Sequence, residues 1–234
     1  MRRFGQIISL SCAFLFVAGC QTPPGPRVVD RLPDPLIDVP YRARPRAAKP
    51  ATPKVKPRVA RRNGESGWMP ARGMSSHWRY IIIHHSATDR GTPQGIDSYH
   101  RQRGWDELGY HFVIGNGVGY PDGKIFVGSR WPKQKYGAHT RVKRHDDNRW
   151  NKFGIGICLI GNFERSRPSR KQIESCARLV KFLSKACRIP AGRVYGHGDV
   201  DPHTKCPGRH LAMSRIKTRI AVLLREERIY ASSN

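Results

Sequence analysis

Acidic residues are scarce in this sequence. The 234 residues include 17 Asp and Glu against 43 Lys and Arg, which gives a formal net charge of +26. The excess is not confined to one end, because residues 76–234 still carry 29 basic and 13 acidic side chains. A field of this sign attracts polyanions such as nucleic acid, anionic lipid or an anionic cell-wall polymer, and charge alone does not choose among them.

Long hydrophobic runs are also lacking. The apolar stretch near the start extends from Ile7 to Val17 behind Arg2 and Arg3, and it is too short to span a membrane comfortably. A basic start followed by a short apolar segment is typical of a signal peptide.

The end of this segment predicts how the protein is attached to a membrane. Val17-Ala18-Gly19-Cys20 resembles the lipobox of bacterial lipoproteins, in which the signal is cleaved before a cysteine that receives lipid. We therefore expect residues 1–19 to be a lipoprotein signal peptide and Cys20 to carry the membrane anchor. Gln21 follows the cysteine and, by resemblance to a sorting rule of some two-membrane bacteria, favours the outer membrane facing the periplasm. The alternative is an ordinary signal peptide with an incidental cysteine.

Cysteine is rare too, with six in the whole chain. Apart from the cysteines of the signal segment and of the candidate site described below, Cys158, Cys176 and Cys187 remain, an odd number. Cys176 and Cys187 lie eleven residues apart on one predicted helix, roughly 16 Å along its axis, which is too far for a disulfide within that helix. Buried free thiols are the interpretation that we favour.

Residues 20–75 have the composition of a linker. They hold 11 of the 18 prolines together with 12 basic residues. Such a segment cannot bury enough apolar surface to fold, so we expect a disordered, basic, proline-rich tether. Its basic side chains either lie along an anionic surface or are simply solvated.

Residues 76–234 are predicted to form one α/β domain. Apolar runs without polar alternation indicate strands buried inside a sheet, and they are separated by segments with helical spacing and N-cap residues. We found no internal repeat. The expected strands cover residues 79–85, 110–114, 124–127, 155–160 and 194–196, and the expected helices begin at Thr92-Pro93, at Ser169 and after Pro207-Gly208.

Two separated segments carry ligands of the kind that zinc prefers. Residues 196–208 read GHGDVDPHTKCPG and contain His197 and Cys206, and residues 80–88 read YIIIHHSAT. Three protein ligands with an open fourth position are typical of a catalytic zinc, whereas structural zinc sites usually have four.

These segments belong to a set of four motifs that occur in a recognisable order. The others are GWDELGYHFVIG at 104–115 and NKFGIGICLIGNF at 151–163. Together the four resemble the type-2 N-acetylmuramoyl-L-alanine amidases, the family of phage amidases and peptidoglycan recognition proteins, over about residues 78–225. The resemblance implies a central mixed sheet flanked by helices and one zinc ion per chain. It also implies hydrolysis of the amide between N-acetylmuramic acid and the first L-alanine of the stem peptide.

The resemblance assigns the metal ligands as His84, His197 and Cys206. His85 does not serve, because adjacent side chains on a strand point to opposite faces, and we expect it to be packed and hydrogen bonded. Zinc held by two imidazoles and a thiolate would activate a water molecule and polarise the carbonyl group of the substrate.

The catalytic residues are also taken from the resemblance. Tyr110 matches the tyrosine of the family's GYHF motif, and Thr204 stands where these amidases have Thr or Lys, with Lys205 next to it. Which of Thr204 and Lys205 faces the substrate is left open, because the gap from His197 to Cys206 is one residue longer than usual. Cys158 stands where the cytoplasmic branch has a catalytic Glu, so this chain resembles the phage and recognition-protein branch.

Other histidines are expected to have lesser roles. His139, in a family-like GAHT motif, is predicted to shape the groove rather than to bind metal. His77, His145, His203 and His210 are interpreted as surface residues.

Three functions were compared on these observations. The favoured one is a monomeric, lipid-anchored zinc amidase whose partner is peptidoglycan or a muropeptide. The second is a recognition module without catalysis, a class that typically lacks the cysteine ligand. The third, a nucleic-acid binder, is suggested only by charge, and neither a basic helix nor an aromatic sheet face for phosphate contact can be placed. Export also argues against it, so we expect no nucleic-acid partner.

Replacing Cys20 with Ser tests the anchor. We expect Cys20→Ser to release the protein from the membrane fraction or to accumulate as an uncleaved precursor, because lipid attachment needs the thiol. Fractionation of cells followed by mass measurement of the N-terminus reads out both effects. The same membrane-bound, processed product from both forms would contradict the prediction.

Overall fold

The computed structural model describes residues 65–140 and 148–232 of the chain. The predicted signal peptide, Cys20 and nearly all of the predicted linker lie outside these residues, as does His145.

One five-stranded mixed sheet organises the described residues. The strands lie in the order β3-β2-β4-β1-β5, with β3 antiparallel to β2 and all other neighbours parallel. This confirms the predicted α/β domain with a central mixed sheet. The strands are β1 (Tyr80–His85), β2 (Phe112–Ile114), β3 (Ile125–Val127), β4 (Gly154–Leu159) and β5 (Val194–Gly196).

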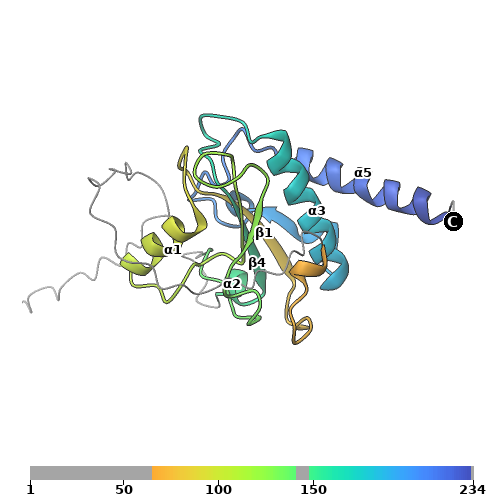
Figure 1. The fold of residues 1–234 in the computed structure, drawn as a ribbon, viewed down its shortest axis with the longest axis horizontal. Coiled ribbons are helices and arrows are strands. Elements are labelled where there is room, and N and C mark those ends of the chain that lie inside the picture. Colours follow the sequence, from red (N-terminus) through yellow and green to blue (C-terminus); the bar gives the residue numbers. More distant parts are fainter. Residues whose placement is uncertain (1–64, 141–147, 233–234) are drawn as a thin grey trace, which may run out of the picture. The chain divides into compact units, whose positions relative to one another are not determined.

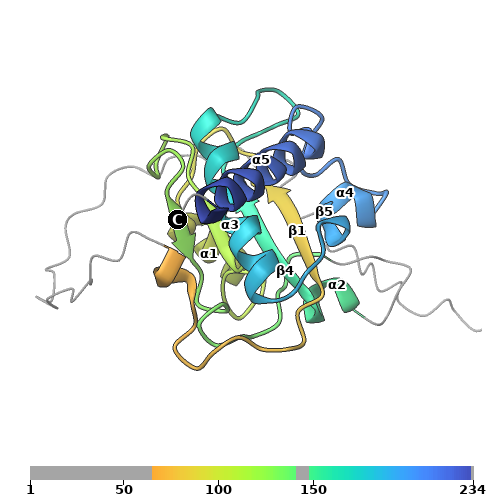
Figure 2. The same ribbon diagram turned by 90° about the vertical axis from the view of Figure 1, so that its right-hand side faces the viewer.

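The central strand is apolar because both faces of the sheet are covered. Helices α3 and α5 lie over one face and α1 over the other (Figures 1 and 2). Ile81 and Ile83 point toward α3 and α5, whereas Ile82 points to the opposite face, and none of the three side chains is exposed to solvent. A strand buried on both sides explains the continuous hydrophobic run in the sequence.

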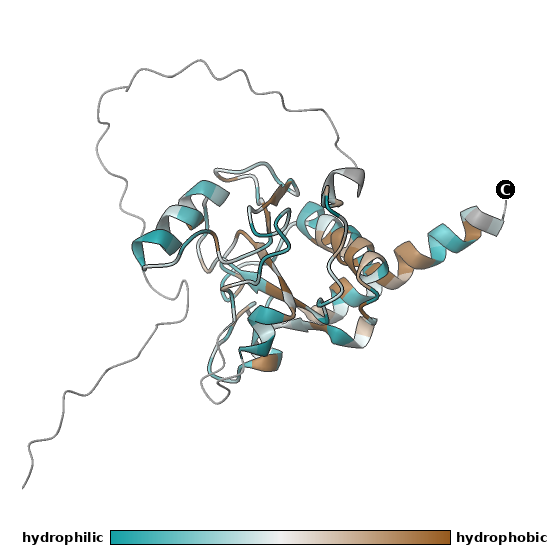
Figure 3. Ribbon diagram, turned by 90° about the horizontal axis from the view of Figure 1, so that it is seen from below, coloured by the Kyte–Doolittle hydropathy of each residue, from teal (hydrophilic) through white to brown (hydrophobic). Residues whose placement is uncertain are grey.

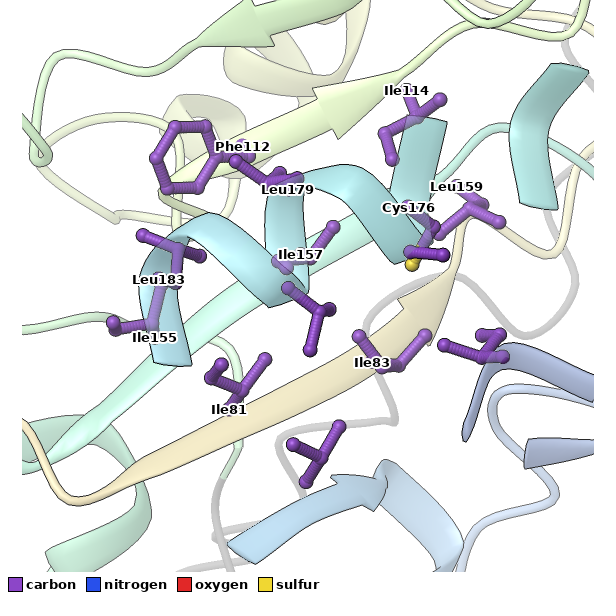
Figure 4. Close-up of a cluster of buried hydrophobic side chains, with 14 of the residues drawn as sticks. Ile81, Ile83, Phe112, Ile114, Ile155, Ile157, Leu159, Cys176, Leu179 and Leu183 are labelled. Carbon is purple, nitrogen blue, oxygen red and sulfur yellow. The ribbon is translucent and has the colours of Figure 1, made fainter. Parts of the chain in front are cut away.

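The larger hydrophobic core lies between the sheet and α3. Figure 4 shows Cys176, Leu179 and Leu183 of the helix above isoleucines of β1 and β4. These side chains are fully buried, which supports the interpretation of Cys176 as a buried free thiol. Burial raises the pKa of Cys176 to about 12, so its thiol remains protonated.

Helix starts follow the N-cap signals in the sequence. The hydroxyl of Thr92 accepts a hydrogen bond from the amide of Gly95, and Pro93 is the first helical residue. Ser169 and Gln172 form the predicted capping box. The helices are α1 (Pro93–Gln102), α2 (Arg149–Lys152), α3 (Arg170–Ala186), α4 (His197–Val200) and α5 (Met213–Ser232), with 3-10 turns at Glu65–Trp68 and Ala191–Arg193.

Several predicted boundaries were wrong. The strand expected over 110–114 begins at Phe112, so Tyr110 lies before it. The last helix begins at Met213 rather than directly after Gly208, because residues 201–212 form a series of turns. Cys187 caps the C-terminal end of α3 and is partly exposed, so the expectation that it is buried was wrong.

The packed region also begins earlier than residue 76. The main-chain oxygen of Trp68 accepts a hydrogen bond of 2.6 Å from the indole of Trp131. The ring of Trp68 packs edge-on against Phe182 of α3, with 5.4 Å between the ring centroids. Composition alone assigned this segment to the linker, but its tryptophan completes one side of the core.

Helix α5 carries both apolar and polar residues. In Figure 3 hydrophobic and hydrophilic residues both occur along α5, as expected for a helix that packs on one side only. Within residues 65–140 and 148–232, no helix combines the length and the apolar character needed to cross a membrane.

Candidate metal centre

The side chain of His84 marks the carboxyl end of β1. Because β1 alternates, His84 and His85 point to opposite faces of the sheet. His85 accepts a hydrogen bond of 3.1 Å at Nδ1 from the amide of Phe163 and is 5% exposed. The prediction that His85 is packed and hydrogen bonded is thus confirmed.

His197 reaches the same place through strand pairing. Gly196, the last residue of β5, lies opposite Ile83 of β1, so the next residue of each strand is a histidine. The ring centroids of His84 and His197 are 4.7 Å apart, and both side chains are buried.

Cys206 completes the group from the loop after α4. Its carbonyl oxygen accepts a hydrogen bond of 2.6 Å from the amide of Gly198 at the start of that helix. Its sulfur lies 3.7 Å from Nδ1 of His84 and accepts from the amide of His85 at 3.5 Å. This loop therefore returns the thiol to the end of β1.

The three side chains fit a zinc ion. One ligand atom from each of His84, His197 and Cys206 lies within 4.8 Å of the others. Zinc binds nitrogen at about 2.0–2.1 Å and thiolate sulfur at about 2.3 Å, so a tetrahedral site places these atoms roughly 3.5 Å apart. The separation of 3.7 Å between Nδ1 and Sγ is close to that value.

Burial keeps the first ligand neutral. Desolvation lowers the pKa of His84 well below its ordinary value, and the neighbouring imidazoles of His197 and His139 lower it further. A neutral imidazole is the form that binds metal, so the surroundings of His84 favour that form before any ion arrives.

Tyr110 lies beside this group but is enclosed. Its ring centroid is 5.2 Å from that of His84, and 1% of the side chain is exposed. It packs in one buried cluster with Cys158, which faces the same side of the sheet as His84 on the neighbouring strand. The structure thus brings Tyr110 to the metal ligands.

Thr204 and Lys205 differ in their surroundings. Thr204 is buried, and its hydroxyl oxygen accepts a hydrogen bond of 3.1 Å from the amide of Cys206. The hydroxyl proton remains available for a second hydrogen bond. Lys205 is exposed next to it.

His139, which was predicted to shape the groove rather than to bind metal, lies buried behind one of the metal ligands. His139 is 1% exposed, and its Nδ1 lies 3.1 Å from Nε2 of His84. The GAHT motif was visible in the sequence, but its position behind a ligand depends on the packing of a loop against β4.

Arg130, which the sequence analysis missed, holds the two segments that carry Tyr110 and His139. It is buried, and it donates hydrogen bonds of 2.7 Å to the carbonyl oxygens of Leu108 and Tyr136. A buried guanidinium that bonds main-chain oxygens on two loops fixes their spacing.

Three of the four histidines interpreted as surface residues lie in the described part of the chain, and two of these, His77 and His210, are only partly exposed. His77 is half-buried and packs against the rings of Trp78 and Tyr136 at 4.1 and 5.4 Å. His203 is exposed and His210 is partly exposed. None of these three belongs to the cluster of metal ligands in the described part of the chain.

Comparisons with known proteins agree with this geometry. Fold and site define an α/β domain with a possible His-His-Cys metal site, and the chain belongs to the N-acetylmuramoyl-L-alanine amidase family, whose model matches residues 74–209.

The relatives come from two groups. Peptidoglycan-recognition protein SC1a of Drosophila melanogaster is 29% identical over 149 residues, which is 59% of this chain and 72% of that protein. Peptidoglycan-recognition protein 2 of Holotrichia diomphalia is 34% identical over 125 residues, 50% of this chain and 57% of that protein. The solved structure of N-acetylmuramoyl-L-alanine amidase LysC from Clostridium intestinale matches with a TM-score of 0.52 at 31% identity, covering 63% of this chain and 89% of that one.

Buried histidines predict how stability depends on pH. Burial lowers the pKa of His85 and of His100 to about 4 and that of His111 to about 3. Unfolding returns each to about 6.5, so between pH 6.5 and 4 the unfolded chain binds more protons. The contribution of these histidines to the free energy of unfolding should be constant above pH 7 and should fall on acidification. The folding equilibrium constant should decrease by up to about tenfold per pH unit for each histidine.

Urea unfolding of the chelator-treated chain at pH 8, 7, 6 and 5 measures this dependence. A hydrogen bond from Lys135 holds the pKa of Asp106 at about 2. This carboxylate therefore stays ionised between pH 8 and pH 5, and its contribution to the free energy of unfolding does not change over this range. Equal stability at pH 8 and pH 5 would contradict the burial of these imidazoles.

Proposed function

We propose that this chain is a zinc-dependent amidase that hydrolyses the bond between N-acetylmuramic acid and L-alanine in peptidoglycan or muropeptides. The observation that carries the proposal is the convergence of His84, His197 and Cys206 from three separate segments. Membership in the amidase family supports a peptidoglycan-related activity.

The alternative is a recognition module that binds peptidoglycan without cleaving it, as the names of several relatives suggest. Such a module needs a groove but no thiolate. Cys206 favours the enzyme, because its sulfur lies 3.7 Å from a ligand nitrogen and accepts the amide of His85. Those contacts orient a thiolate toward a metal and contribute nothing to a wall-binding surface.

Each residue of the site has a defined task in this proposal. His84, His197 and Cys206 hold the ion, and zinc supplies the Lewis acidity that activates water and polarises the scissile carbonyl. Tyr110 donates from its phenol to the oxyanion that develops on that carbonyl, and the hydroxyl of Thr204 is a second donor. Exposed Lys205 attracts the negative charge of the wall fragment. Hydrolysis leaves a lactyl carboxylic acid on the sugar and a free amine on L-alanine.

We further propose that this activity is located at the cell envelope, on a chain tethered by lipid at Cys20. The support is the lipobox-like sequence and the basic, proline-rich composition of residues 20–75. A tether of about 3.1 Å per residue in extended form would let the domain reach a polymer well away from its anchor.

The substitution Cys206→Ala separates the enzyme from the recognition module. We expect one zinc per wild-type chain and, from purified peptidoglycan, products with a free L-alanine amine. In Cys206→Ala, zinc and product should both disappear, because two imidazoles alone hold zinc far more weakly, while wall binding survives. Metal analysis, mass spectrometry of the digest and sedimentation with peptidoglycan measure the three quantities.

Cys187→Ala is the matched control, since Cys187 caps the end of α3 and is absent from the metal cluster. It should behave as wild type in all three measurements. A wild-type chain that sediments with peptidoglycan but contains no zinc and releases no amine would establish the recognition module instead.

Tyr110→Phe tests the phenol alone. We expect turnover to fall by roughly 10²–10³-fold with zinc still bound, which is the typical effect of losing one oxyanion donor. Tyr99→Phe on α1 is the control and should keep wild-type turnover. Unchanged turnover in Tyr110→Phe would mean that Tyr110 serves only to pack the core.

A further inference from the structure

His139 contacts the metal ligand His84 from behind and has no task in the proposed reaction. Its Nδ1 lies 3.1 Å from Nε2 of His84, and the ring centroids are 5.0 Å apart at an angle of 73°. Both rings are about 1% exposed, so solvent does not compete for this contact. The contact is on the edge of His84 opposite to the nitrogen that faces Cys206.

A carbonyl group determines the proton position on His139. Nε2 of His139 lies 3.1 Å from the main-chain oxygen of Gly154, which can only accept, so Nε2 carries the hydrogen. In a neutral ring, Nδ1 is then the acceptor. The hydroxyl of Thr140 lies 2.9 Å from the same Nδ1, to which it can donate, and 3.4 Å from Nε2 of His84, so its oxygen is a second acceptor beside that nitrogen.

The proton position on His84 follows from that of His139. Because Nδ1 of His139 accepts, Nε2 of His84 has to be the donor across their 3.1 Å contact. A hydrogen on Nε2 leaves the lone pair of His84 on Nδ1, the atom that lies 3.7 Å from Sγ of Cys206. The opposite tautomer would place two lone pairs against each other and direct an N–H toward the metal position.

The fold leaves space for His139 at this place. A side chain at Gly137 or at Gly156 would approach the ring of His139 to 2.3 Å, so both positions require glycine. The main-chain amides of His139 and Thr140 both donate to Oδ1 of Asn151, at 2.7 and 2.9 Å. Two glycines and a shared acceptor thus hold the imidazole against His84.

We propose that His139 is a positioning residue that fixes His84 in the Nε2–H tautomer, with Nδ1 free to bind the metal. His139 does not touch substrate or metal and acts only through His84. The inference rests on the proposed zinc binding. Partners of this kind typically raise metal affinity by about 10–100-fold.

Two amide substitutions in the full chain separate the two ends of the His139 ring. In His139→Asn the short side chain places its amide oxygen near the former Nδ1, where it accepts from His84, and the bond to Gly154 is lost. In His139→Gln the longer side chain reaches Gly154, and the acceptor for His84 is lost. Each variant keeps one hydrogen bond and loses the other, so a merely structural role predicts equal effects.

Zinc affinity is measured by competition with a chromophoric chelator, and stability by urea unfolding. We expect His139→Gln to weaken zinc binding about 10–100-fold and His139→Asn to stay within about threefold of wild type. Equal weakening that follows the loss of stability, or no weakening in His139→Gln, would overturn the proposal.

A second measurement uses only the wild-type chain, so it does not depend on whether a variant folds. In the metal-free wild-type chain, nitrogen NMR of the imidazoles should show His84 protonated at Nε2, with a scalar coupling across the hydrogen bond to Nδ1 of His139. A hydrogen on Nδ1 of His84 would overturn the proposal. A wild-type chain that has this tautomer but binds no zinc contradicts the proposed function, whereas zinc binding with equal variants contradicts only the role of His139.

Discussion

The pairing of β1 with β5 is the contact on which the site depends. The carboxyl ends of two parallel strands lie at the same edge of the sheet. In this pair, Ile83 near the end of β1 lies opposite Gly196 at the end of β5. The next residues, His84 and His197, are more than a hundred positions apart in the chain but adjacent in space. A shift of one residue in this register would turn one of the two histidines to the other face, so the hydrophobic pattern of β1 also specifies the metal ligands.

Behind these ligands lies a polar layer in the interior of the domain. His100, His111 and His139 are fully buried, and each has at least one hydrogen-bond partner on the main chain. His111, for example, accepts from the amide of Gly156 and donates to the carbonyl oxygen of Lys135. Buried polar groups are tolerated when they are hydrogen bonded, and here they tie loops to the sheet at defined positions.

The choice between catalysis and recognition depends on few atoms. Fold, sheet and most buried side chains serve both functions equally, since one fold can support either activity. The sulfur of Cys206 differs, because its environment of a ligand nitrogen and a main-chain amide is suited to a thiolate. Net charge does not separate the two functions, because it favours encounter with an anionic wall in both cases.

The buried strands, the helix caps and the ligand set could be predicted from the sequence, because each has a local signature or lies within a motif. The buried run at β1, Thr92-Pro93 and the box formed by Ser169 and Gln172 are examples. The four motifs placed His84, His197 and Cys206 through family resemblance, and alternation along the strand set His85 apart. These features involve residues near each other in the chain, or spacings that a motif preserves.

Other features were decided only by tertiary structure. That Trp68 belongs to the core depends on Trp131 and Phe182, which follow it by more than sixty residues. His139 reached the back of His84 because Gly156 leaves room on β4 and because Asn151 holds the loop. No local pattern encodes such contacts, since each depends on the simultaneous packing of segments that are far apart in the sequence. The sequence by itself determined which residues could bind a metal. The packing of the folded chain determined which side chains lie behind those ligands.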